Sequence, residues 1–411
     1  MSDVQIAHTA DVNAPAKVSL GFVLLLGALS ALAPLSIDIY LPSLPTIARV
    51  FSVSTGAAQD TLAAFLAGLA IGQFFYGPAS DRWGRRGPIL IGAALYVAAS
   101  ILCAVSTSIE MLMVARFLQA IGGSAGVVIA RAIVRDRYNH RDSARVLSML
   151  MLVSGLAPVI APLIGSALLT IASWRASFWL MAIVGAAILV ASAFRLTESR
   201  SEETRLQAMG EHPLRSYVTL LTHAQLVGFI LAGALNSAAV FAYVAAAPGL
   251  LIGFYGIPAS QFGWYFSTNS VALIAMNQVN RMLLRHYSPE QIVTLARPGS
   301  LVFAAALILT AWTGLGGMYG VLIPLFFVIG SFGLVSANTM AGGLNVDPRR
   351  AGSISALMGG AQFAFGALAS SFTGLMHDNG PRPLSLAVGL CMAGSAAALY
   401  GLALRRPKAA T

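Results

Sequence analysis

The chain has 411 residues, of which 57% are hydrophobic and only 10% are charged. Soluble domains carry about 25% charged residues, so this composition excludes an ordinary soluble protein and indicates a chain dissolved in a bilayer. The formal net charge of +10 could suit a nucleic-acid partner, but the distribution of the basic residues along the chain argues against one.

A membrane-spanning helix needs about 20 mostly apolar residues. The sequence predicts twelve such spans, separated by charged residues or by Pro and Gly. We expect the first to be retained rather than cleaved as a signal peptide, because it is long and contains Pro34 and Asp38. The spans cover residues 17–40, 56–79, 87–106, 109–131, 144–168, 175–196, 222–247, 261–284, 297–313, 318–343, 351–376 and 382–404.

The basic residues fall almost entirely on one side of these spans. Of the 25 Lys and Arg residues, only Arg49, Arg175 and Arg382 are counted with the segments on the other side, and Arg116 alone is counted inside a span. The other 21, which include Arg131 and Arg297 at the ends of their spans, are counted with the loops on the first side. Cytoplasmic loops are enriched in Lys and Arg, so both termini are predicted to be cytoplasmic and the excess charge to contact anionic lipid headgroups.

The longest internal polar stretch, residues 197–216, divides the twelve spans six and six. We expect an N-terminal half over 1–196, a cytoplasmic linker over 197–216 and a C-terminal half over 217–411. A weak repeat supports this division, since Pro45 and Phe51 recur at the same spacing as Pro248 and Phe254. Two related halves are typical of transporters that rock about a central site.

Two charges in apolar surroundings are candidates for function. Asp38 lies near the outer end of span 1, and Arg116 lies about 10 Å below the outer surface in span 4, at 1.5 Å per residue. Buried ionisable groups are costly in a membrane, so we expect the two to pair, directly or through water. Asp38 could bind and release a proton. A solvated Asp38 at the surface and a purely structural ion pair are the alternatives.

The run between spans 2 and 3, GPASDRWGRR, is a tight charged loop at the membrane surface. Asp81 lies at the C-terminal end of a helix, where the helix dipole disfavours an anion, so an Arg or another helix N-terminus must offset it. Such an arrangement suits a conformational switch, although the arginines could simply follow the positive-inside rule. Its residues are Gly77, Asp81, Arg82, Gly84, Arg85 and Arg86.

Polar and aromatic residues within the second half are candidates for substrate binding. Asn236 and Tyr243 are seven residues apart, so one helix face can present both, whereas the adjacent Gln362 and Phe363 cannot both point inward. We favour Gln362 over Phe363; packing between helices is the alternative. No metal- or nucleotide-binding motif is present, so we expect no cofactor and no catalytic constellation.

The loop pattern G-x-x-x-D-R-x-G-R-R resembles the signature loop of the major facilitator superfamily. Further segments, including PLSIDIYLPSLP (34–45), RFLQAIGGSAG (116–126) and RAIVRD (131–136), resemble the Bcr/CflA family of bacterial drug-resistance exporters over nearly the whole chain. Span 5, with Pro158, Pro162 and Gly165, is similar to the antiporter motif of proton-driven exporters.

This resemblance implies twelve transmembrane helices in two pseudo-symmetric halves, a bacterial inner-membrane location, and export of small amphipathic drugs in exchange for protons. It also implies proton binding at Asp38 and a functional need for Arg116. Some relatives carry a second acid two turns earlier, where this chain has Ser30. We expect a monomer powered by the proton gradient. An exporter or facilitator of a physiological small solute, such as a peptide, amino acid or sugar, is the alternative.

Overall fold

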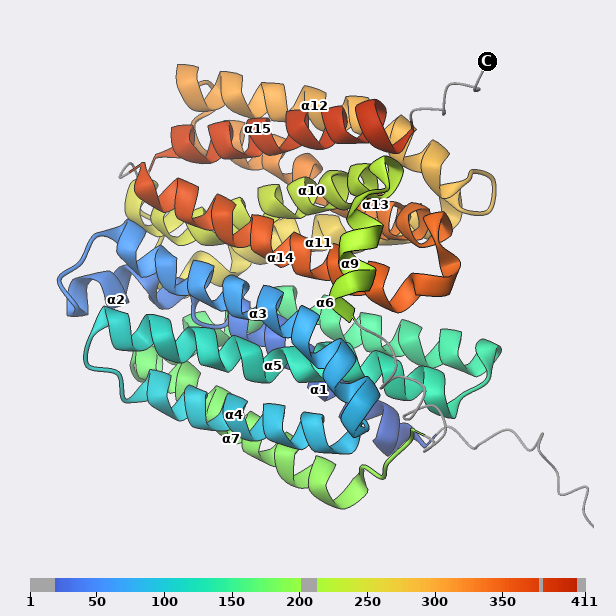
Figure 1. Cartoon of the computed structure of the whole chain (residues 1–411). Helices are drawn as coiled ribbons and strands as arrows, with labels where there is room; N and C mark the ends of the chain where they lie inside the picture. Colours follow the sequence, from blue (N-terminus) through green and yellow to red (C-terminus); the bar gives the residue numbers. More distant parts are fainter. Residues whose placement is uncertain (1–18, 201–212, 377–379, 405–411) are drawn as a thin grey trace, which may run out of the picture.

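Helices form all the regular structure in the part of the chain that the computed structural model describes, residues 19–200, 213–376 and 380–404 (Figure 1). The predicted all-α class is confirmed. The long helices are α1 (Leu20–Asp38), α3 (Thr55–Trp83), α4 (Arg86–Ala104), α5 (Ile109–Arg137), α6 (His140–Ile171), α7 (Trp174–Arg195), α10 (Ala224–Pro248), α11 (Ala259–Leu283), α12 (Pro289–Thr313), α13 (Gly317–Val346), α14 (Ala351–Leu375) and α15 (Pro381–Ala398).

Shorter segments extend or connect these helices. They are η1 (Leu41–Ser43), α2 (Leu44–Val50), α9 (Pro213–Leu221), η2 (Gly249–Phe254), η3 (Pro348–Arg350) and η4 (Leu399–Ala403). The chain ends that we predict to be cytoplasmic, and residues 201–212 of the predicted linker, lie outside the described residues.

The long helices correspond one to one with the twelve predicted spans. Eleven segments of the described chain are both long and apolar enough to cross a membrane. The remaining one, α11, has 25 residues and is long enough, but it contains the polar run Ser267–Ser270. Ser267, Asn269 and Ser270 are tolerated because they face other helices and a cavity rather than lipid, as shown below. The exposed Thr268 donates its hydroxyl to the Trp264 carbonyl of its own helix.

The first span differs from the prediction because its helix ends inside the protein. α1 stops at Asp38, but the chain stays within the bundle through η1 and α2 to Val50. Pro42 has no N–H to bond the carbonyl of Asp38, and its ring would clash with that carbonyl, so a regular helix cannot continue. Asp38 is therefore only 3% exposed and does not lie at the outer surface.

The ninth span is longer than predicted. α12 begins at Pro289 rather than near Arg297, and Ser288 with Gln291 forms a capping box at its start. We counted Arg297 among the cytoplasmic loop charges, which is wrong: its side chain is completely buried two turns into the helix. Sequence alone could not show that neighbouring helices cover this side chain.

The two halves lie side by side in Figure 1, with α1 to α7 below and α10 to α15 above. Two helix pairs join them, α3 with α14 and α6 with α11. The repeated segments α2 and η2 also meet across this interface. We use "basic end" for the end of the bundle with the loop Trp83–Arg86 and the last turns of α5 and α7, and "opposite end" for the end with α2 and η2.

Close backbone approaches join the halves near the opposite end. A Cβ at Gly56 of α3 would overlap the carbonyl of Gly374 in α14, across the halves. Within the first half, a Cβ at Gly165 of α6 would overlap the carbonyl of Ile39. Between α6 and α11, Gly263 N–H donates to Ser166 Oγ at 3.2 Å, and Ser267 Oγ donates to the Val159 carbonyl at 2.7 Å. Small residues permit this packing, which closes the interface at the opposite end.

Gly165→Ala should destabilise the protein by about 1–3 kcal/mol, because the added methyl group has no room beside the Ile39 carbonyl. Gly155→Ala on the same helix is the matched control, since no neighbouring atom lies within 4 Å of its Cβ position. Thermal unfolding of the purified variants in detergent measures the difference. Equal melting temperatures for the two variants would contradict the packing described here.

Candidate functional site

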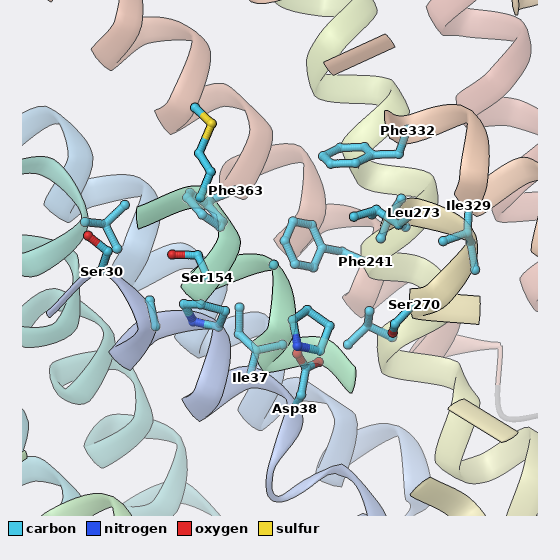
Figure 2. Close-up of a pocket in the computed structure, with 18 of the residues that line it drawn as sticks. Ser30, Ile37, Asp38, Ser154, Phe241, Ser270, Leu273, Ile329, Phe332 and Phe363 are labelled. Atoms are coloured by element: carbon cyan, nitrogen blue, oxygen red, sulfur yellow. The ribbon is translucent and has the colours of Figure 1, made fainter. Parts of the chain in front are cut away.

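A cavity of about 300 Å³ lies between the two halves (Figure 2). It is lined by α1, α5 and α6 from the first half and by α10, α11, α13 and α14 from the second. The closed contacts of the opposite end lie beyond Asp38, and the cavity extends toward the basic end as far as Arg131 and Leu147. The cavity is therefore bounded by close helix contacts toward the opposite end.

Asp38 provides the only acidic side chain among the described residues that line the cavity. It is the last residue of α1, and Pro34 precedes it by one turn on the same face. Figure 2 shows its carboxylate at the end of the cavity beside Ile37, facing Ser270 of the other half. A carboxylate in these surroundings can exchange a proton with water in the cavity.

Tyr243 faces Asp38 from the second half. Its hydroxyl interacts electrostatically with Asp38 and accepts a hydrogen bond of 2.8 Å from Asn269 Nδ2. Its ring stacks on Phe266, with the ring centres 5.3 Å apart. Because Asn269 acts as the donor, the hydroxyl proton of Tyr243 remains available for Asp38 or for a bound molecule.

Arg116 does not pair with Asp38; the expected direct contact is absent from the described residues. Its guanidinium instead donates to Gln119 Oε1 at 2.6 Å and to the carbonyl of Ser36 at 3.0 Å. It also lies over the rings of Tyr40 and Phe65, at 4.2 and 4.0 Å from their centres. The prediction that the two charges lie at similar depth is confirmed, because Arg116 contacts Ser36, two residues before Asp38. However, α5 directs the Arg116 side chain into the core of the first half.

The contact with Ser36 explains what Arg116 does for α1. The last four carbonyl groups of a helix have no partner within the helix, and they carry its negative dipole end. Arg116 neutralises this end two residues before Asp38. The two residues are therefore connected through the end of α1 rather than through an ion pair.

Arg116→Gln should lower stability by about 1–3 kcal/mol, since buried acceptors lose their donor. A double-mutant cycle with Gln119→Leu should give a coupling above about 0.5 kcal/mol, whereas the cycle with Asp38→Asn should give less. Both cycles use the free energy of unfolding in detergent. A larger coupling to Asp38 than to Gln119 would show that an ion pair exists after all.

Only two of the four predicted substrate-binding residues line the cavity. Tyr243 and Phe363 line the cavity, and Asn236 and Gln362 do not. Asn236 is turned away, and its Oδ1 accepts a hydrogen bond of 3.4 Å from the buried Arg297. The preference for Gln362 over Phe363 is not supported, because this turn of α14 presents the aromatic ring to the cavity.

Several lining residues were missed by the sequence analysis. Phe241 packs on Phe363, with ring centres 5.8 Å apart, and Phe332 adds a further aromatic side chain (Figure 2). Arg131 also lines the cavity, one turn from Val127 on α5. The one-turn spacing to Val127 was visible in the sequence, but the arginine was assigned to the neighbouring loop.

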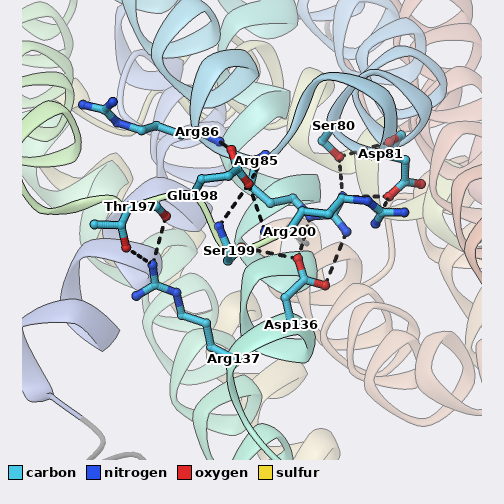
Figure 3. A network of polar contacts seen from close by, with 11 residues as sticks. Ser80, Asp81, Arg85, Arg86, Asp136, Arg137, Thr197, Glu198, Ser199 and Arg200 are labelled. Atoms are coloured by element: carbon cyan, nitrogen blue, oxygen red, sulfur yellow. Dashed lines mark hydrogen bonds and ion pairs between the residues drawn. The ribbon is translucent and has the colours of Figure 1, made fainter. Parts of the chain in front are cut away.

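The charged loop forms a network at the basic end (Figure 3). Asp81 Oδ1 contacts Arg85 and Arg200, each at 2.8 Å, and Arg85 also contacts Asp136 at 2.8 Å. The two arginines provide the offset that Asp81 requires at the end of α3. All these residues belong to the first half or directly follow α7, so the network ties the start of the linker to that half.

Glu198 is held against the start of α4. It accepts hydrogen bonds from the backbone N–H groups of Arg85 and Arg86 at 2.9 and 3.1 Å. Gly84 has a φ of +87°, and a Cβ there would overlap the Glu198 carboxylate. Partial burial acts to raise the pKa of Glu198, but the backbone donors, which include Ser199 and Arg200, together lower it.

The remaining predicted switch residues lie around this network. Arg86 donates to the Ala193 carbonyl at 3.0 Å, and Arg82 lies in the last turn of α3. No atom of a neighbouring segment comes within 4 Å of a Cβ built on Gly77. Of the antiporter-helix residues, Pro158 and Pro162 lie inside α6, and Pro158 borders the cavity.

Glu198→Gln should destabilise the protein by about 1 kcal/mol, because the anion that caps α4 is lost. A lowered pKa means that this stability is present above the ordinary value of 4.5 and is lost as the pH falls through the lowered value. Melting temperatures of wild type and variant should therefore converge on acidification. A difference that stays constant throughout the acid range would refute this role of the charge.

Two helical halves around a shared cavity, built from helices long and apolar enough to cross a membrane, are the architecture of a multi-pass membrane transporter. The chain belongs to the Major Facilitator Superfamily, whose pattern it matches over residues 26–371. This confirms the fold that we predicted from the loop motif.

The relatives agree with the predicted branch of the superfamily. The chain is 32% identical to a bicyclomycin resistance protein homolog of Haemophilus influenzae, covering 94% of this chain and 97% of that one. It is 30% identical to the multidrug resistance protein MdtL of Escherichia coli, covering 68% and 70%. A solved D-xylose-proton symporter shares the fold, with a TM-score of 0.74 at 15% identity over 92% and 96% of the two chains.

Proposed function

We propose that this protein is a proton-coupled antiporter of the bacterial inner membrane that exports small amphipathic drugs by alternating access. The observation that carries the proposal is a mainly apolar cavity between the halves with a single acid, Asp38, among its described lining residues. The relatives named for bicyclomycin and multidrug resistance support drugs as the substrate class.

The proposed orientation places the basic end in the cytoplasm, with both chain termini. Arginines gather at this end, as the positive-inside rule requires, and they would contact anionic headgroups. The cavity then faces the cytoplasm and is closed on the outside, which is the state that receives a drug for export. We propose a monomer that needs no resident cofactor and is powered by the proton gradient.

Proton coupling would work through the charge state of Asp38. In the state seen here, Asp38 releases its proton to the cytoplasmic side and a drug enters beside Tyr243 and Phe363. The contacts of α3 with α14 and of α6 with α11 then open, and the cavity faces outward. Protonation of Asp38 from outside removes the charge that favours the drug, and the empty, protonated carrier returns.

The charge network would act as the conformational switch. Asp81, Arg85 and Arg200 hold the start of the linker on the first half, away from the cavity. A change in this network alters how freely the second half can rock, without altering the lining of the cavity. We therefore assign it to the rate of turnover rather than to drug affinity.

Asp38→Asn should abolish proton-driven export, because an amide does not take up a proton in this pH range. Everted vesicles with an imposed proton gradient, supplied with labelled bicyclomycin, measure uptake for wild type and variant. Wild-type uptake should collapse when a protonophore is added. The variant should still reach the membrane in normal amount.

Glu110→Gln is the matched control, because Glu110 is an exposed acid in the first turn of α5 and lies outside the cavity. It should keep wild-type uptake. Gradient-driven accumulation by Asp38→Asn at the wild-type level would overturn the proposed role of Asp38. Wild-type uptake that is the same with and without the proton gradient would overturn the proposed antiport.

A further inference from the structure

Arg131 is placed in the wall of the cavity and not in the loop that follows α5. It lies about 9 Å before the end of that helix at 1.5 Å per residue, and it shares a helix face with the lining residue Val127. Its side chain is exposed, and Leu147 and Leu150 of α6 line the same part of the cavity. A charge that only obeyed the positive-inside rule would not need this position.

The guanidinium of Arg131 has no hydrogen-bond acceptor or carboxylate partner among the described residues. The charged neighbour that acts on it is another cation, Arg135, one turn further along α5. Asp38, the other charge in the cavity, lies at the far end. Positive charge in a confined, mainly apolar space attracts an anion, and a planar guanidinium fits a carboxylate with two hydrogen bonds.

The distance between the two charges limits what can touch both. Gly126 of α5 packs against the backbone of Leu29 in α1, so these two residues lie at the same depth. Asp38 is nine residues beyond Leu29 toward the opposite end, and Arg131 is five residues beyond Gly126 toward the basic end. At 1.5 Å per residue, their backbones differ in depth by about 20 Å. A free amino acid is too short to bridge them.

We propose that the cavity binds aromatic amphiphiles that carry a carboxylate, with the carboxylate on Arg131 and the ring system against Phe241, Phe332 and Phe363. This inference rests on the proposed transport function and names a substrate class for the same cavity. Asp38 at the far end stays free to exchange a proton while such a molecule is bound.

Equilibrium binding tests this assignment without any proton gradient, so a failure of antiport would not affect it. The full-length protein in phosphatidylcholine nanodiscs is dialysed against labelled 2-naphthoate or its neutral analogue 2-naphthamide. Wild type should bind the carboxylate about tenfold more tightly than the amide, as a charge-assisted bidentate contact predicts. Arg131→Gln should remove this preference and leave the affinity for the amide unchanged.

Two further variants separate recognition from structure. Arg131→Lys should keep part of the preference, because it keeps the charge but not the planar fork. Arg135→Gln should change either affinity by less than about twofold, since Arg135 lies outside the cavity in solvent where a charge is screened. Equal affinities of wild type for the two probes, or an equal loss of both in Arg131→Gln, would overturn the proposal.

A lipid headgroup could supply the same anionic chemistry. The measurement is therefore repeated in nanodiscs that contain phosphatidylglycerol. We expect unchanged affinity for 2-naphthoate. If phosphatidylglycerol weakens 2-naphthoate binding to wild type but not to Arg131→Gln, the lipid phosphate occupies Arg131. That result would overturn the substrate assignment.

Discussion

The structure depends on the end of one helix inside an apolar medium. Pro42 stops α1 at Asp38, and unpaired carbonyl groups at that depth would be costly without water. Arg116 resolves this by donating to the carbonyl of Ser36 from the neighbouring helix, while Tyr40 and Phe65 cover its guanidinium. The end of α1 can therefore lie inside the protein, with the buried carboxylate of Asp38 beside the cavity. Without this donor, Asp38 would need either a continuous helix or exposure at the surface.

The two ends of the bundle have different kinds of contact. At the opposite end, glycine backbones of α3 and α14 meet with almost no intervening side chain, so small separations break the contact completely. At the basic end, Asp81, Arg85 and Arg200 form charge contacts within the first half and the start of the linker, and the Asp81 side chain is 45% exposed. Packing of the first kind is either made or broken, which suits a contact that must open and close the opposite end. Charge contacts of the second kind can exchange partners while the helices move, which suits control of the rate of a conformational change.

Hydropathy and charge were sufficient to predict the architecture, because the bilayer fixes helix length and leaves only helices for a chain of this composition. Depth could also be read, as for Asp38 and Arg116. The direction of a side chain around its helix could not. Arg297 has the pattern of a loop charge but is buried, and Phe363 rather than Gln362 lines the cavity. Both outcomes depend on which neighbouring helix covers which face, and a single sequence with weak amphipathic periodicity does not contain that information.

Asp38 is the single carboxylate among the described residues that line the cavity, and Ser30 stands where a second acid could, so the proposed exchange has an electrical consequence. If one proton enters per cycle through Asp38, the net charge moved depends only on the passenger. A monocation leaving would make the exchange electroneutral, so the membrane voltage would do no work on it. A neutral molecule would gain one charge of voltage work and a monoanion two, at about 2.3 kcal/mol per charge for each 100 mV. The same carrier would then concentrate anionic passengers against steeper gradients than cationic ones.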